Sequence, residues 1–196
     1  MNKKRYTGFI VGGLFVVIGI FLIITYNSLV RKEVRMQTQW SEVQNAYQRR
    51  LDLIPNLINT VKGVAGFEQN VLTEIAAARS KAQSVNIDSA NVDASKFQEQ
   101  NVAQNGLANA SNKIIITIEK YPELKGTESF LALQTDLLGT ERRIKVARKD
   151  FNEAVRDYNS SVRSFPTSLA AGIFSFKAKN GFTADSGTDK ATEIKF

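Results

Sequence analysis

Few residue types in this chain are suited to acid–base or nucleophilic chemistry. Histidine and cysteine are absent from the 196 residues, so that carboxylates, lysine and tyrosine are the remaining proton donors and acceptors. A thiol nucleophile, a disulfide framework and a zinc site of the usual kind are excluded for the same reason. The carboxylates follow no metal-ligand pattern such as Glu-x-x-His, and neither a phosphate-binding glycine loop nor a nucleophile elbow occurs. We therefore expect no enzymatic activity, no metal and no cofactor.

Charged residues interrupt two stripes of apolar residues that recur at alternating steps of three and four, one from Trp40 and one from Phe130. This spacing is typical of long helices that pack against each other and predicts an all-α protein. The charged stripe positions are Arg50, Glu68, Glu141 and Arg148. Either these long side chains extend their charged ends to water, or they pair across helices. The first two would lie about 27 Å apart along one helix and the last two about 10 Å apart along the other. At most one cross-helix pair is therefore expected, unless another acid such as Asp52 takes part.

Proline 55 stands inside the first stripe, in the segment RRLDLIPNLINTVKG of residues 49–63. Proline removes a backbone donor and costs roughly 3 kcal/mol in a helix interior. The stripe keeps its phase across Pro55, which favours one kinked helix, but proline also suits the first turn of a new helix. The residues alone leave both open. Asp52 and Asn56 are expected to satisfy the backbone groups freed at this junction, with a recognition surface as the alternative.

A repeated aromatic–asparagine spacing marks the end of the second stripe, where Asn152 and Asn159 are one heptad apart and Tyr158 precedes the latter. Asparagine is a poor helix former, so two of them in a helix interior need a reason. We expect hydrogen bonds between helices, as a seam asparagine makes in coiled coils. Ligand binding is the alternative.

The N-terminal region has the pattern of a membrane anchor. Residues 7–26 (TGFIVGGLFVVIGIFLIITY) are uncharged, and about twenty apolar residues match the thickness of a bilayer core. A cleaved signal peptide is the competing interpretation, but its A-x-A-like cleavage site is missing, since the first alanine is Ala46. The chain has a net charge of +7. Residues 1–50 contain eight Lys/Arg and two Glu and so account for +6 of it (8 − 2). The basic residues therefore flank the membrane and attract anionic lipid. We expect no nucleic-acid partner, because such binding would require a basic face on the folded domain and none is evident in the sequence.

The remaining breaks follow proline, glycine and polar stretches. Pro122, in KYPELKG, predicts a turn between helices, and Pro166 ends the last long helix. A loop is expected over Ser84–Asp93, whereas the glycines of GVAG at 63–66 are expected within a helix. The apolar segment SLAAGIFSF follows Pro166, and we predict disorder from about residue 177.

Several segments together resemble the LemA family of bacterial membrane proteins over roughly residues 26–176. They are YNSLV after the apolar segment, RRLDLIPNLINTVKG, the AAAR that ends at Arg79, and the long stretch Leu137–Pro166 (LLGTERRIKVARKDFNEAVRDYNSSVRSFP). Phe151 departs from the family pattern, in which tyrosine is more frequent. The resemblance implies an antiparallel, up-and-down bundle of four helices on a membrane anchor, but no particular activity.

This implication favours a helix break at Pro55, with the kinked first helix of a three-helix bundle as the alternative. The bundle helices are expected near 28–52, 55–83, 94–120 and 127–165. The expected division is a basic flank over 1–5, a transmembrane helix over 6–27, the bundle over 28–166 and a tail over 167–196.

These features predict a binding or scaffolding module of the cell envelope. It would contact lipid through residues 6–27 and their basic flanks, and an envelope protein or another copy of itself through the bundle. A ligand-sensing bundle coupled to the membrane helix is one alternative. A membrane-surface or membrane-shaping protein that uses SLAAGIFSF as a second contact is another. Because both flanks of the apolar segment are basic, the positive-inside rule is nearly balanced. The compactly basic N-terminus favours an extracytoplasmic bundle over a cytoplasmic one.

Overall fold

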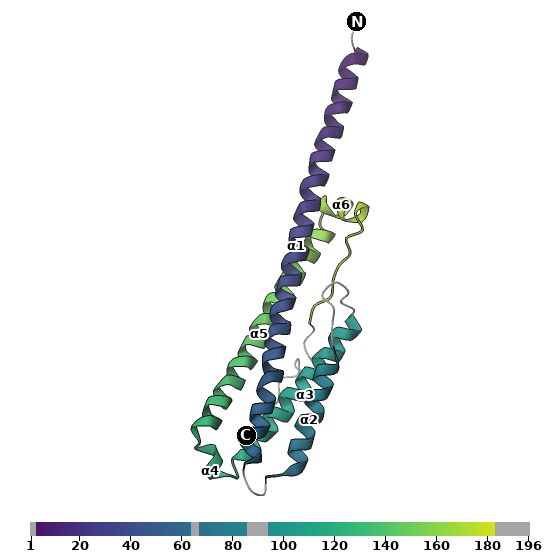
Figure 1. Ribbon diagram of the computed structural model, residues 1–196. Helices are drawn as coiled ribbons and strands as arrows, with labels where there is room; N and C mark the ends of the chain where they lie inside the picture. The colour runs from purple at the N-terminus through teal and green to yellow at the C-terminus, as the bar shows by residue number, and fades with distance from the viewer. Residues whose placement is uncertain (1–2, 64–66, 86–93, 183–196) are drawn as a thin grey trace, which may run out of the picture.

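The computed structural model describes residues 3–63, 67–85 and 94–182. All regular structure in these residues is helical, which confirms the all-α prediction. Long helices run alternately down and up the bundle, and the first of them extends far beyond the others (Figure 1). The helices are α1 (Lys3–Lys62), α2 (Gln69–Ser84), α3 (Ala94–Ile118), α4 (Pro122–Lys125), α5 (Glu128–Arg163) and α6 (Thr167–Ile173).

Helix α1 is both the membrane segment and the first helix of the bundle. Its 60 residues are continuous and correspond to about 90 Å at 1.5 Å per residue. It is the one helix of the described residues that is long and apolar enough to span a membrane. Its apolar side chains before Tyr26 are largely exposed, whereas Leu29 and the residues that follow on the same face are buried. The predicted division near residue 27 is therefore a change of environment within one helix.

The predicted helix break at Pro55 is wrong. Pro55 lies inside α1, and the chain turns only after Lys62, so that Gly63 lies in a turn rather than in a helix. Because Pro55 has no N–H, the carbonyl of Leu51 loses its bond within the helix. The Arg79 Nε of α2 donates to that oxygen at 3.3 Å. A donor from the neighbouring helix thus replaces the missing one, and the apolar stripe continues in phase.

The two later bundle helices, α3 and α5, lie close to their predicted bounds of 94–120 and 127–165. Helix α2 follows the turn and ends at Ser84, where the predicted loop begins. Residues 86–93 of that loop and Gly66 of GVAG lie outside the described residues. The predicted turn at Pro122 contains the short helix α4, and Thr127 caps α5 by accepting from the Phe130 N–H at 3.3 Å.

The core consists of two clusters along the bundle. One lies at the end remote from the membrane segment and combines Leu57, Ile75, Ile114 and other buried apolar residues of the long helices. The second contains Trp40 of α1, which packs with aromatic residues of α3 and α5. Burial of each such side chain contributes about 1.5–3 kcal/mol. This second cluster forms one wall of the candidate site.

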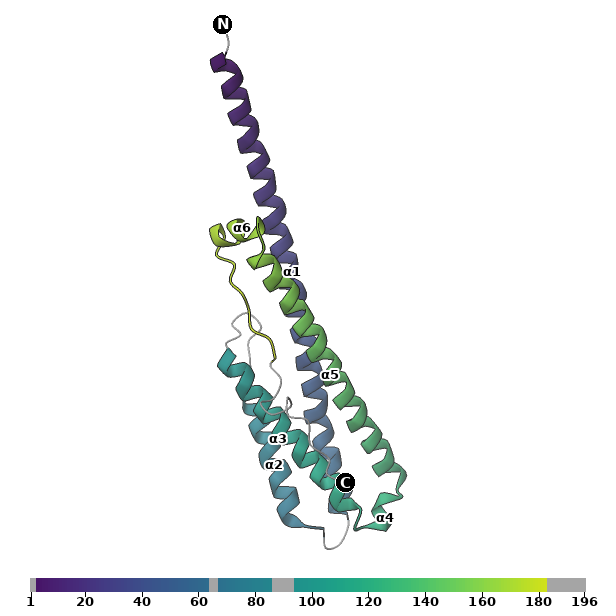
Figure 2. The same cartoon turned by 180° about the vertical axis from the view of Figure 1, so that it is seen from behind.

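The C-terminal segment turns back onto the bundle after α6. Ser175 adopts a positive φ of 59°, and the Phe176 N–H donates to the Ala171 carbonyl at 2.9 Å, as in a Schellman motif. Residues 177–182 then run down beside α5 and α3 (Figures 1 and 2). Disorder from residue 177 is therefore wrong for 177–182, and residues 183–196 lie outside the described part of the chain.

Candidate functional site

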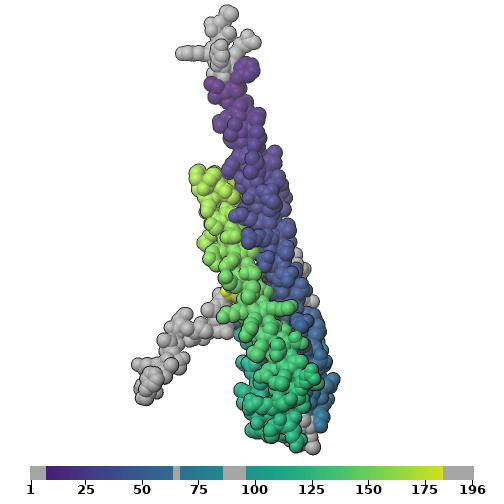
Figure 3. Space-filling view, turned by 90° about the vertical axis from the view of Figure 1, so that its left-hand side faces the viewer, coloured from purple at the N-terminus to yellow at the C-terminus, as the bar shows by residue number. Residues whose placement is uncertain are grey.

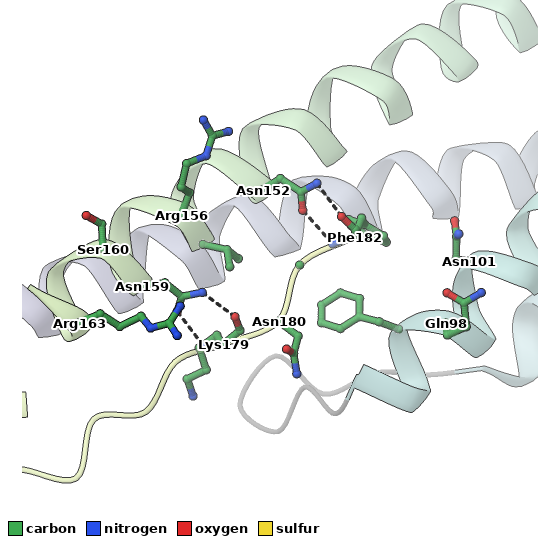
Figure 4. Close-up of a pocket in the computed structure, with 13 residues that line it drawn as sticks. Gln98, Asn101, Asn152, Arg156, Asn159, Ser160, Arg163, Lys179, Asn180 and Phe182 are labelled. Carbon is green, nitrogen blue, oxygen red and sulfur yellow. Dashed lines mark hydrogen bonds between the residues drawn. The ribbon is translucent and has the colours of Figure 1, made fainter. Parts of the chain in front are cut away.

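The candidate site is a groove between α5 and the beginning of α3, and residues 177–182 of the same chain lie in it (Figure 4). With the segment in place, a space of about 670 Å³ remains beside it, and residues 179–182 line this space. Its walls include side chains of α3 and α5 as well as the C-terminal segment itself. We call this feature the asparagine groove, after Asn152 and Asn159, which hold the segment in place.

Each of these asparagines binds the backbone of one residue of the segment through both ends of its amide. Asn152 accepts from the Phe182 N–H at 2.8 Å and donates to the Phe182 carbonyl at 3.0 Å. Asn159 accepts from the Lys179 N–H at 2.8 Å and donates to the Lys179 carbonyl at 2.7 Å. Seven helical residues span about 10.5 Å, and three extended residues span about 10 Å. The heptad spacing of the asparagines therefore matches the spacing of the two backbone positions that they bind.

The Phe182 side chain is the apolar anchor of the segment. Its ring lies 5.2 Å from that of Phe97, 5.7 Å from that of Phe151 and 5.9 Å from that of Trp40, between centroids. The Arg148 guanidinium lies 5.0 Å from its ring centroid. Phe182 thus completes the second core cluster with aromatic contacts and a cation–π contact.

Two further residues of the segment are sterically or electrostatically matched to the groove. A Cβ atom on Gly181 would lie 2.6 Å from Asn152 Oδ1, so that any larger residue at this position would displace the amide. The Lys179 Nζ lies 3.2 Å from Glu33 Oε1 of α1, and both side chains are largely shielded from water. The groove therefore accepts a basic residue followed two residues later by glycine and then phenylalanine.

The prediction that Asn152 and Asn159 hydrogen bond between helices is wrong, because their partners belong to an extended segment.

Tyr158, predicted to lie with these asparagines, points into the core and is fully buried, and its hydroxyl has no hydrogen-bond partner in the part of the chain that the structure describes. Burial raises the pKa of Tyr158 to about 12. Burial also raises the pKa of Tyr47, although Arg148 donates to its hydroxyl at 2.8 Å. Both phenols are protonated near neutral pH, and neither is suited to act as a general base.

Among the charged stripe residues, one pair forms across helices, and the spacing of these residues predicted at most one. The buried Arg50 Nη2 donates to Glu141 Oε2 at 2.6 Å, and Arg50 Nη1 also donates to Gln104 of α3. Arg148 instead binds Tyr47 and Phe182. The prediction that Glu68 lies on the packed stripe is wrong. Glu68 is exposed at the start of α2, and its Oε1 lies 2.9 Å from the Lys120 Nζ.

The roles predicted for the residues around Pro55 are also corrected. Asp52 is exposed and accepts from the Gln48 amide one turn earlier, at 2.7 Å, and Asn56 is exposed on the outer face of α1. Neither was needed at the freed Leu51 carbonyl, because Arg79 reaches it from α2.

The functional residues that the sequence analysis missed lie in the tail: Lys179, Gly181 and Phe182. Their neighbourhood is small and polar, and it lacks the periodicity that marks a helix or strand. A lone phenylalanine beside glycine in such a stretch was the available signal.

The fold and this groove define a class of protein: a membrane-anchored helical bundle whose own C-terminal segment is bound along α5. The sequence model of the LemA family matches residues 39–196 of this chain. The chain therefore belongs to the LemA family, as its motifs indicated.

Two curated relatives carry different names. Protein LemA of Metamycoplasma hominis is 26% identical over 138 residues, which cover 69% of this chain and 59% of that protein. Magnetosome protein MamQ 2 of Paramagnetospirillum magneticum is 23% identical over 187 residues, which cover 82% of this chain and 65% of that protein. The match therefore spans less than two thirds of the length of each relative.

Proposed function

We propose that this protein is a membrane-anchored binding module whose asparagine groove recognises an extended segment of another envelope protein, and that residues 177–182 occupy the groove at rest. The observation that carries this proposal is the double amide contact of Asn152 and Asn159 with main-chain atoms. Main-chain contacts of this kind supply affinity for any extended chain, and side-chain pockets add specificity.

The specificity expected for a partner follows from the occupant. A segment of the form Lys-x-Gly-Phe reproduces the ion pair with Glu33, the close approach to Asn152 and the aromatic anchor. The intramolecular segment has the advantage of a high effective concentration, in the millimolar range for a short linker. A partner therefore binds when its contacts exceed this advantage or when the segment is held elsewhere.

The test uses the full chain in lipid nanodiscs and a fluorescent peptide with the sequence of residues 176–182 (FKAKNGF). Phe182→Ala weakens the internal occupant by removing its anchor, so this variant is expected to bind the peptide at least tenfold more tightly than the unmodified chain, which corresponds to about 1.4 kcal/mol. Adding Asn152→Ala and Asn159→Ala to the same variant should abolish the gain, because the main-chain contacts are lost. Fluorescence anisotropy measures both affinities.

Matched controls separate the groove from unspecific binding. Asn109→Ala removes an exposed asparagine of α3 outside the groove and should leave peptide binding unchanged. A peptide with alanine in place of Gly181 should bind poorly, because its Cβ meets the Asn152 amide. Equal affinity of the peptide for all variants, or no affinity for Phe182→Ala, would contradict the proposal.

We further propose that the bundle faces the extracytoplasmic side, with a cytoplasmic bundle as the alternative. Its support is the compact basic cluster ahead of the apolar segment, which is typical of a signal anchor. An envelope partner would then meet the groove outside the cytoplasmic membrane. Scaffolding is the expected consequence, because the described groove offers binding contacts and no group poised for proton transfer.

A further inference from the structure

Helix α6 presents apolar side chains outward, although a surface helix of a water-soluble domain presents polar ones. Its buried positions are the small residues Ala170 and Ala171, which face the bundle. Its exposed positions, together with the residues at its two ends, are large and apolar: Phe165, Leu169, Ile173 and Phe174. Contiguous exposed apolar surface of this kind marks a site of interaction with a protein or a membrane.

The position of α6 along α1 places this apolar face beside the membrane segment. Helix α6 contacts both α1 and α5, and the Phe174 and Phe176 rings lie 4.9 and 5.7 Å from that of Tyr26, between centroids. Tyr26 is the last residue of the predicted membrane segment 7–26. Thr25, the residue before it, is buried in the described structure, whereas Ile23 and Ile24 are exposed. The apolar face of α6 therefore continues directly from the surface of the membrane segment.

The orientation of α6 also suits the plane of a membrane. Helix α6 runs across α1 rather than along it (Figures 1 and 2). In space-filling view it forms a shoulder at the level where the slender part of α1 leaves the bundle (Figure 3). If α1 crosses the bilayer, a helix that runs across it at this level lies in the interfacial layer.

Basic residues flank the apolar face in the sequence, and Arg163 among them also lines the asparagine groove. Arg163 and Lys177 are exposed on either side of α6 in sequence, and Arg31 is exposed on α1 one turn and a half beyond Tyr26. Lys32 is directed to α5, where its Nζ donates to Ser161 Oγ at 2.6 Å. Cations near the surface attract anionic headgroups, and an apolar face with such flanks is characteristic of interfacial helices.

We infer that α6 is an interfacial membrane helix, whose Phe165, Leu169, Ile173 and Phe174 insert into the headgroup–acyl boundary of the same bilayer that α1 spans. The bundle then has two contacts with the membrane, which hold it at a defined height and restrict its rotation about α1. The inference is independent of the asparagine groove, because none of the four apolar residues lines that groove.

The test labels single cysteines with the environment-sensitive fluorophore NBD, which is straightforward because the chain has no native cysteine. Ile173→Cys reports on the apolar face of α6. Ile116→Cys on α3 is the matched control, because both isoleucines are similarly exposed, 66% and 70%, and Ile116 lies near the end of the bundle remote from the membrane segment. Each full-length variant is reconstituted into vesicles of equal parts phosphatidylcholine and phosphatidylglycerol, with and without bromine on the acyl chains.

The expected result is a shift to shorter emission wavelength and quenching by brominated lipid for the label at position 173, and neither effect at position 116. Water-like emission without quenching at 173 would overturn the inference. Emission at 173 that shifts without quenching by brominated lipid would also overturn it, because a second copy of the protein, and not lipid, would then cover the face. Circular dichroism establishes that both variants retain the helical fold.

Discussion

The replacement of a missing helical hydrogen bond at Pro55 leads to the most stringent prediction. The Leu51 carbonyl depends on Arg79, since the residue four positions later is proline. Arg79→Met keeps the length and most of the apolar stem of the side chain but removes the donor. The variant is expected to lose about 1–3 kcal/mol of unfolding free energy, the cost of leaving a buried acceptor unpaired or of losing a bond from a charged donor.

Pro55→Ala provides the second arm of a double-mutant cycle. Alanine restores the N–H that binds the Leu51 carbonyl and removes the clash of the proline ring, which gives at most about 3 kcal/mol of stabilisation. In this background the Arg79 donor is redundant, so Arg79→Met should cost only about 0.5 kcal/mol or less. The expected coupling energy between the two positions is therefore about 0.5–2.5 kcal/mol.

Urea unfolding of the full chain in detergent micelles measures all four free energies. Trp40 is the single tryptophan and is 1% exposed, so its fluorescence reports on the opening of the bundle. Arg142→Met, at an exposed position of α5, is the matched control and should change stability by less than about 0.5 kcal/mol. Equal costs of Arg79→Met with proline and with alanine at position 55 would refute the reasoning.

Three further predictions concern the other buried and exposed groups. The neutral phenol of Tyr158 contributes stability that is fully present below about pH 10 and is lost as the pH rises through its folded-state pKa of about 12, by at most about 3 kcal/mol. Tyr158→Phe should reduce the alkaline loss of stability in urea melts between pH 9 and 12 and leave the part due to Tyr47, whose pKa burial also raises. An unchanged loss would exclude Tyr158 as a source. Glu141→Ala should lower the unfolding free energy by about 2 kcal/mol, because it removes the carboxylate partner of the buried Arg50 while leaving the Gln104 contacts. The control Lys145→Ala, at an exposed position one turn later, should lower it by less than about 0.5 kcal/mol. Equal losses would show that the ion pair adds nothing to stability. Asn109→Cys should react with a membrane-impermeant maleimide on intact cells if the bundle is extracytoplasmic, and reaction only after lysis would place it in the cytoplasm.

The sequence alone determined the features that depend on residues near each other in the chain. The uncharged segment 7–26 predicted the membrane helix from length and polarity, and the two apolar stripes predicted the long helices α1 and α5. These predictions succeed because helix formation and amphipathicity depend on neighbours three and four residues apart. At Pro55 the same local reasoning left a kinked helix and a helix break open, and the break that the family resemblance favoured is wrong because a donor from another helix replaces the missing one.

Only the tertiary structure decided which groups meet across the bundle. The heptad spacing of Asn152 and Asn159 was visible, but their partners lie 30 and 20 residues further on, respectively, and are brought back by the reversal at Ser175. Arg50 and Glu141 are 91 residues apart in the sequence, and they meet only because of the register in which α1 and α5 pack. Side-chain spacing along one helix specifies the face on which a residue lies. The packing of the whole chain specifies the element that covers this face, because that depends on the turns between elements and on the burial of all the faces together.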